Sequence, residues 1–468
     1  MKKSTIAIGI IALLGAVWTG AAWFTGSKAE EYYRQAVADT NAQLQQIAES
    51  SNQALTLHIN TLDFQRGIFS SQIKDQLVIN AVIKGEKVQW IVPFSDTLYH
   101  GPFPLNQVKA FNFMPNMLSW VSEVTPHDSI AGWFKVTQGV SPIISDLVIS
   151  YNQKITGQVK IADTNYVSDQ NSLAWQDFTL NLDGMNFDGV GKGNVYLGSF
   201  QSKTPLGESF SLDKLDINLN IQKLLGGNLY LGDSKLQFAQ LALQAKEQHF
   251  LLKDGKMEQS TEEEEGFINA DLSLVTKENY WQNKPLGEIT FLVSLKHLEK
   301  QAFVDLAQLP NSKQFTEKEL SIYKQAKRKI WRNQPHLILK SSFENTAGKL
   351  KAKVNIELSK FQQRRSKLLD LFKQFEILLD LDKGALEQYS TILHQNIYNL
   401  SEQQAQRETQ LISEVLDNLQ ADNLIVNKDN EVKVSLILED DEMKLNGEPL
   451  SEQVAQKLLY ELLYPLMN

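Results

Sequence analysis

The sequence predicts an α+β protein with three successive regions. They are an N-terminal transmembrane helix, an extended and mainly antiparallel β-sheet region, and C-terminal strands that carry amphipathic helices. Three observations predict this class: an uncharged N-terminal run, apolar alternation with a period of two through the middle of the chain, and a return of helical periodicity in the last third. We therefore expect four parts, at residues 1–26, 27–50, 51–297 and 298–468.

The first part is expected to be a membrane anchor. Residues 4–26 carry no charge, and about 20 residues suffice for a helix to cross a bilayer. Lys2 and Lys3 precede the run, and this bias places the N-terminus in the cytoplasm and the body of the protein outside it. A cleaved signal peptide is the alternative interpretation. Small residues at Ala12, Ala16 and Gly20 could also let two such helices approach, so a homodimer stays open.

A juxtamembrane helix is expected at residues 27–50. Its apolar positions recur at helical spacing: Tyr33, Ala36, Val37, Thr40, Leu44 and Ile47. Such a stripe docks on another surface, here either the next domain or a copy of itself.

Strands are expected through residues 51–297. In the clearest example, Leu215, Ile217 and Leu219 alternate with polar residues, which is typical of an antiparallel sheet with one polar face. The segment QSTEEEEG at residues 259–266 is expected to be a solvated loop, because adjacent glutamates repel one another.

Helices return in residues 298–468. Thr316 and Glu319 have the spacing of a capping box at a helix start. A second long helix is expected from about Ala385 to Leu419, and the pair Asn446-Gly447 is expected to close the last strand.

Composition excludes several classes of function. The net charge of −9 over 468 residues argues against a nucleic-acid binder. The absence of cysteine excludes disulfides and thiolate chemistry. The seven histidines show no ligand-pair spacing, so we expect neither a metal nor a cofactor.

Two motifs resemble a known family. FQRGIFSSQI (Phe64–Ile73) and HGPFPL (His100–Leu105) are similar to hallmarks of the YdgA-like family of Gram-negative proteins, a domain of unknown function. The segments VWTGAAWFTG and MKLNGEPLS extend the resemblance to both ends of the chain. It implies a single-span inner-membrane protein with a periplasmic body, and it transfers no catalytic residue.

The residues of these motifs are candidates for a structural or binding role. Pro102 and Pro104 fix their own φ angles and restrict Gly101 and Phe103, so we expect a stiff corner that ends strand pairing. His100 is interpreted as a hydrogen-bonding residue of this corner, because a catalytic role needs a nucleophile or metal within reach.

The first motif contains a second pair of candidates. Gly67 is expected at a turn or bulge within strand sequence. Arg66 is expected to pair with a carboxylate, and the alternative is that it binds an anion or a lipid headgroup.

We do not expect an enzyme, and the alternative that stays open is a hydrolase whose active site has no recognisable motif. No G-x-S-x-G elbow is present, and Ser71 to Lys74, which match S-x-x-K, lack their companion motifs. We expect a protein that binds lipid or another hydrophobic envelope ligand, or alternatively a dimeric interaction module for envelope proteins. An apolar concavity would favour the first, a flat exposed patch the second, and a buried polar cluster with a strongly shifted acid an enzyme.

Overall fold

The computed structural model describes residues 2–50, 55–83, 85–168, 171–226, 229–246, 248–309, 315–360 and 369–467. The chain forms two compact units, Met1–Ser202 and Lys203–Asn468. Strands hold 54% of the residues and helices 27%, and the pairings from β1 to β6, from β11 to β18 and between β18 and β20 are all antiparallel. The expected α+β class is therefore wrong, and antiparallel sheet dominates the chain.

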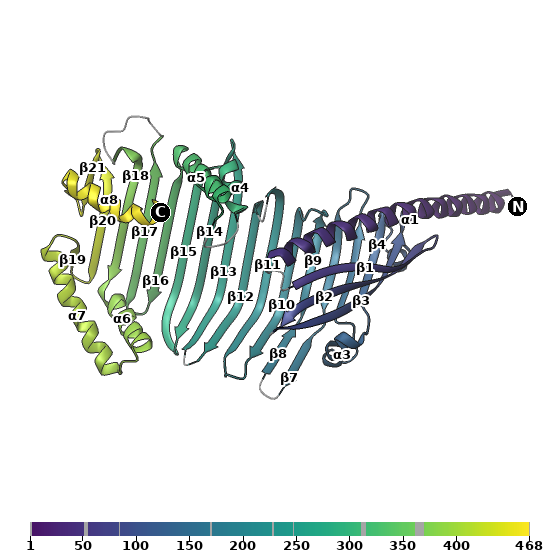
Figure 1. Cartoon of the computed structure of the whole chain (residues 1–468), viewed down its shortest axis with the longest axis horizontal. Helices are drawn as coiled ribbons and strands as arrows, with labels where there is room; N and C mark the ends of the chain where they lie inside the picture. Colours follow the sequence, from purple (N-terminus) through teal and green to yellow (C-terminus); the bar gives the residue numbers. More distant parts are fainter. Residues whose placement is uncertain are drawn as a thin grey trace. The chain divides into compact units, whose positions relative to one another are not determined.

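The first unit is a long helix on a meandering sheet (Figure 1). Its helices are α1 (Lys2–Ser50), α2 (Leu105–Lys109) and α3 (Ala131–Val136). Its strands are β1 (Leu55–Arg66), β2 (Ser70–Ile83), β3 (Glu86–His100), β4 (Leu118–Val124), β5 (Ile143–Ile149), β6 (Ile155–Ile161), β7 (Thr164–Ser168), β8 (Asn171–Gln176), β9 (Phe178–Met185) and β10 (Gly191–Lys203). Each of β1 to β5 pairs with the next strand along the chain, β6 also pairs with β9, and β9 pairs with β10. β7 and β8 pair with each other.

Helix α1 docks on this sheet with the apolar stripe that its sequence predicts. Ala29 and Tyr33 are buried in a cluster with Ile73 of β2 and Leu98 of β3. The Asn41 side chain donates to the carbonyl oxygen of Ile59 at 3.0 Å and accepts from its N–H at 2.7 Å, which ties the helix to β1. The stripe thus covers the chain's own sheet. The side chain of Ile47 lies outside the described residues.

The expected transmembrane anchor is wrong. Among the residues that the structure describes, no helix is long and apolar enough to cross a membrane. α1 runs past Gly26 to Ser50, and the last part of the apolar run is used for packing within the protein. Ala22 is fully buried, and the Thr25 hydroxyl donates to the carbonyl oxygen of Gly101 at 2.8 Å.

The localisation expected from the anchor, a single-pass protein of the inner membrane, is wrong for the same reason. A single-pass inner-membrane protein with a cytoplasmic N-terminus and a periplasmic body requires a spanning helix, and none is found in the described part of the chain. The side chains of Ala12 and Ala16, which suggested helix dimerisation, lie outside the described residues.

The second unit continues the antiparallel pattern. Its strands are β11 (Ser209–Gly226), β12 (Leu229–Ala245), β13 (Gln248–Glu264), β14 (Phe267–Trp281), β15 (Lys284–Glu299), β16 (His336–Asn345), β17 (Gly348–Leu358), β18 (Phe372–Asp382), β19 (Val426–Lys428), β20 (Glu431–Glu439), β21 (Glu442–Leu445) and β22 (Glu448–Pro449). Its helices are α4 (Lys300–Ala307), α5 (Glu317–Arg332), α6 (Lys383–Ile397), α7 (Glu402–Ala421) and α8 (Glu452–Met467). α8 closes a core in which Leu459 packs with Phe375 and Met443.

The helices of this unit are insertions in a meander, which explains the error in fold class. α4 and α5 lie in the connection between β15 and β16, yet these two strands pair directly. α6 and α7 likewise interrupt the chain between β18 and β20, which also pair. The sheet therefore continues through the region in which the sequence predicted strands that carry amphipathic helices.

Of the helix and turn signals predicted in this unit, some are confirmed and one is wrong. The capping box at Thr316 and Glu319 is confirmed, and Asn446 and Gly447 form the turn between β21 and β22. The single helix expected at 385–419 is two helices, because Ser401 begins a new one with its own capping box to Gln404.

Most of the glutamate-rich segment is a strand rather than a loop, and only Glu265 and Gly266 form a turn. Glu262 to Glu264 belong to β13 and pair with β14. Alternation sends adjacent side chains to opposite faces. Lys223 and Lys300 also approach Glu263 at 3.6 and 2.6 Å, which offsets the expected repulsion.

Candidate functional site

Two aspartates lie on the buried face of the sheet in the first unit. In the β2–β3 hairpin Asp75 pairs with Phe94 and Ile73 with Asp96, so the two aspartates are diagonal neighbours on one face. Asp75 is 5% exposed and Asp96 2%. Apolar residues on the same face, including Ile73 and Leu98, are what place these carboxylates inward.

A groove opens over this pair, between α1 and the sheet. We call it the acid-pair groove; it is defined by Tyr33, Ala36 and Val37 of α1 and by Asp75, Asp96 and Trp120 of β2, β3 and β4. Its volume is about 330 Å³, at the small end of the range for ligand sites. Most of its remaining lining is apolar, with Ile59, Phe94, Ile155 and Phe187 among the contributors.

The acid pair is incompletely hydrogen-bonded. The indole N–H of Trp120 donates to Asp96 Oδ1 at 3.0 Å. Within the described residues, Asp75 Oδ1 is buried without a hydrogen-bond partner, and so is the hydroxyl of Tyr33. Buried polar atoms are normally satisfied, so two unpartnered ones at a single groove are a feature that requires explanation.

The electrostatics of the pair follow from its surroundings. Burial raises the pKa of Asp75 to about 7, and the Asp96 carboxylate adds to the effect by repulsion and by a hydrogen bond to the protonated acid. Near neutral pH the Asp75 carboxyl group is therefore only partly ionised. The groove therefore combines an apolar lining with a negatively charged, hydrogen-bond-accepting end.

Asp75, Asp96 and Trp120 are not among the candidate residues that the sequence predicts. A signal was present: in β2, Asp75 stands in line with Ile73, Leu77 and Ile79 and interrupts an otherwise apolar face. What no pattern in the sequence contained was the register that brings a second aspartate beside it.

His100 lies at a different place, where β3 ends. It is 1% exposed, and its Nδ1 is 2.9 Å from the carbonyl oxygen of Ile68 while its Nε2 is 2.9 Å from the hydroxyl of Ser71. A carbonyl only accepts, so Nδ1 carries the proton and the Ser71 hydroxyl donates to Nε2. Burial lowers the pKa of His100, with a further lowering by the Arg66 charge against the opposing effect of the Ile68 carbonyl.

The distance between Ser71 and His100 is that of a nucleophile–base pair, but a substrate cannot reach the Ser71 hydroxyl. Ser71 is fully buried, and Gly26 of α1 lies so close that a Cβ built there would be 2.4 Å from His100 Nδ1. The proton on Nδ1 goes to a backbone carbonyl rather than to a carboxylate. A substrate has no approach to this hydroxyl while α1 is docked.

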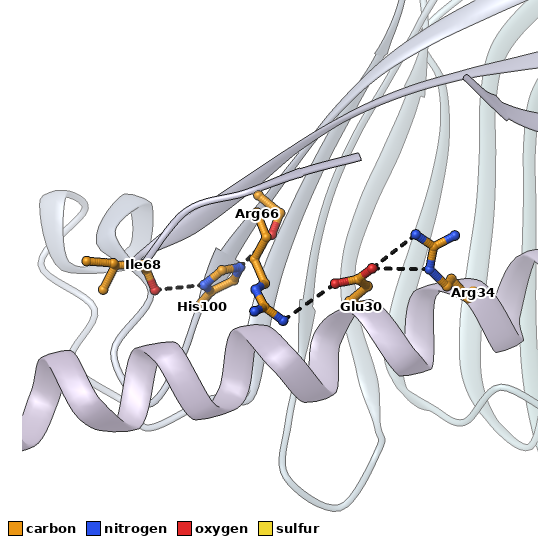
Figure 2. A network of polar contacts seen from close by, with 6 residues as sticks. Glu30, Arg34, Arg66, Ile68 and His100 are labelled. Carbon is orange, nitrogen blue, oxygen red and sulfur yellow. Dashed lines mark hydrogen bonds and ion pairs between the residues drawn. The ribbon is translucent and has the colours of Figure 1, made fainter. Parts of the chain in front are cut away.

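Arg66 and Gly67 lie next to this corner. Figure 2 shows Arg66 between His100 and Glu30, with its guanidinium 3.6 Å from Glu30, which also pairs with Arg34 at 3.0 Å. Arg66 further lies over the ring of Trp23 at 6.0 Å. Gly67 follows the end of β1, and its N–H donates to the Ser70 carbonyl oxygen at 2.9 Å.

Residues 101–104 link β3 to α2. The N–H of Gly101 donates to the Met117 carbonyl at 2.8 Å, and a side chain there would meet the Asn116 carbonyl at 2.0 Å. The carbonyl oxygen of Pro102 accepts from Asn116 N–H at 2.9 Å. Pro104 is buried and begins α2, and Phe103 is half-buried between them. None of the motif residues lines the acid-pair groove within the described part of the chain.

Comparison with known proteins places the chain among bacterial relatives. A family model described as a bacterial protein of unknown function (DUF945) matches residues 1–453. An uncharacterized protein of Haemophilus influenzae is 28% identical over 319 residues, which are 65% of this chain and 85% of that protein. Protein YdgA of Escherichia coli is 28% identical over 327 residues, which are 67% of this chain and 63% of YdgA.

A more distant relative is the uncharacterized protein YihF of Escherichia coli, 22% identical over 251 residues, which are 52% of this chain and 49% of YihF. The matched parts thus cover less than two thirds of each Escherichia coli protein. No solved structure matches the chain. The resemblance to the YdgA-like family is confirmed, and the chain belongs to this bacterial family of unknown function.

Proposed function

We propose that the unit formed by residues 1–202 binds a small amphipathic ligand in the acid-pair groove. The apolar body of the ligand packs between α1 and the sheet, and its polar end meets Asp75 and Asp96. The observation that carries this proposal is an apolar concavity with two buried, unpartnered polar atoms at its lining, Asp75 Oδ1 and Tyr33 Oη.

A bound ligand would offset the cost of the unpaired polar atoms in the groove. An unpaired buried acceptor costs about 1–3 kcal/mol, and a ligand donor that reaches it recovers that cost. Apolar lining contributes about 25 cal/mol for each Å² of ligand surface removed from water. Ligand sites in proteins combine these two features, a mostly apolar wall and a few placed polar groups.

Filling the groove tests the proposal. N-phenyl-1-naphthylamine, an uncharged apolar probe whose fluorescence rises out of water, is titrated into the full-length protein. Ala36→Trp places an indole in the groove, and Ala38→Trp places the same side chain on the exposed face of α1 two residues away. We expect Ala36→Trp to reduce probe affinity at least about tenfold, a difference of 1.4 kcal/mol, and Ala38→Trp to leave it unchanged.

Equal probe binding by the two variants would contradict the proposal. Far-UV circular dichroism and the melting temperature of each variant show whether α1 remains docked. A loss of binding by Ala36→Trp counts only when its spectrum matches that of Ala38→Trp; otherwise Val37→Phe, a smaller filling of the same groove, replaces it.

A second candidate, an acid–base hydrolase, is favoured by one observation. Asp75 is a buried acid with a strongly raised pKa beside a second carboxyl group, and such pairs occur at catalytic sites. A panel of p-nitrophenyl esters and peptide substrates tests it. Turnover that Asp75→Asn abolishes supports catalysis, whereas probe binding without turnover supports the binding function alone.

A further inference from the structure

We propose that the ligand of the acid-pair groove carries a protonated amine, which Asp75 and Asp96 hold at the polar end. This inference rests on the proposed binding function and specifies its substrate class: an alkyl or aryl ammonium compound rather than a neutral lipid or a fatty acid.

The first step in the argument is the absence of a protein cation at the pair. In the described residues, every ion pair of the first unit joins exposed or half-exposed side chains of α1 and β1, and none includes Asp75 or Asp96. Buried carboxylates are ordinarily paired, because an isolated buried charge is costly. A cation brought by the ligand supplies the missing partner.

The second step is the count of ligating groups. Zinc and calcium sites normally supply three or more protein ligands, and no cluster of three or more histidine or acidic side chains that could hold a metal ion is found among the described residues. Two carboxylates in the groove suit a monovalent ammonium instead, since its N–H groups only donate and carboxylate oxygens only accept.

The third step is the aromatic lining. The rings of Tyr33 and Trp120 meet edge to face with their centroids 5.8 Å apart, and both line the groove. Aromatic faces attract cations within about 6 Å of the ring centroid. The same groove repels a carboxylate headgroup, because like charges in a partly desolvated site disfavour one another.

The experiment compares three ligands that differ only at the polar end. n-Octylammonium, n-octanol and octanoate are titrated into the full-length protein by calorimetry at pH 8. We expect octylammonium to bind at least about tenfold more tightly than octanol and octanoate to bind most weakly, which corresponds to one charge-assisted hydrogen bond or more.

Two matched variants assign the effect. Asp75→Asn removes the charge at the groove, and Asp146→Asn removes one from an exposed position on β5. We expect the first to weaken octylammonium binding about 10- to 100-fold while octanol binding changes less than about threefold, and the second to change neither.

The outcomes separate the two proposals. Equal affinity for octylammonium and octanol, with both lost in Ala36→Trp, would overturn the ammonium inference and leave the binding groove standing. The ammonium inference is also wrong if Asp146→Asn weakens octylammonium binding as much as Asp75→Asn does, because the effect then comes from the net charge of the protein. If no eight-carbon ligand binds and the naphthylamine probe also fails, both proposals are wrong.

Discussion

Replacing Asp75 by asparagine is expected to stabilise the first unit at pH 8. The pKa of Asp75 rises from 3.8 to about 7 on folding, through burial first and the Asp96 carboxylate second. The folded state therefore binds this proton more tightly than the unfolded state does. Wild-type stability falls as the pH rises from about 4 to about 7, and the penalty is complete above that window.

The magnitude follows from the shift. About three pH units at about 1.4 kcal/mol each set an upper limit near 4 kcal/mol. Water in the open side of the groove screens the charge, so we expect a gain of about 2 kcal/mol for Asp75→Asn at pH 8. At pH 4 the carboxyl group is protonated in the folded state and already close to half protonated in the unfolded state, so the variant should differ little from wild type.

The assay must report the first unit alone, because a chain of two compact units need not unfold in one step. Urea unfolding with pulsed hydrogen exchange, read on peptides from β2 to β4, gives a midpoint for the strands that carry the pair. Asp146→Asn is the control for net charge. A gain of the same size at pH 4 and pH 8, or none at pH 8, would refute the electrostatic account of the pair.

Two further predictions concern the His100 corner. Gly26→Ala places a methyl group 2.4 Å from His100 Nδ1 and should lower the free energy of unfolding by about 2 kcal/mol. Gly20→Ala, with open space around it, should be neutral or stabilise α1 by up to about 1 kcal/mol. Thermal unfolding compares the two variants, and equal melting temperatures would contradict the close packing at Gly26. Ser71→Ala leaves His100 Nε2 buried without its donor and should lower the free energy of unfolding, measured in urea, by about 1–2 kcal/mol. Ser95→Ala on β3 is the control and should change the free energy of unfolding little. A Ser71→Ala protein as stable as wild type would show that the hydrogen bond contributes nothing to stability.

Much of the local structure was predictable from the residues. Alternating apolar positions identified the strands, the stripe through Tyr33 and Val37 identified the buried face of α1, and Thr316 with Glu319 marked a helix start. These features depend on neighbours within a few positions, and backbone periodicity and capping geometry act over that range.

The errors share one cause. An apolar run such as residues 4–26 has the composition of a lipid-facing helix, but the end of that run packs against His100 and Gly101 of the same chain. Neighbours in the sequence predict a loop for the run of glutamates, whereas the lysines that pair with Glu263, Lys223 and Lys300, lie far away in the sequence. In each case the deciding contacts are long-range.

The sequence by itself determined the antiparallel strands, the amphipathic face of α1, the lack of thiol chemistry and the membership of a bacterial family of unknown function. Only the tertiary structure decided that α1 covers its own sheet and that Asp75 and Asp96 meet beneath it. The physical reason is register: the β2–β3 hairpin sets which residues are opposite one another, and a shift of one position would turn one of the two carboxylates to the other face.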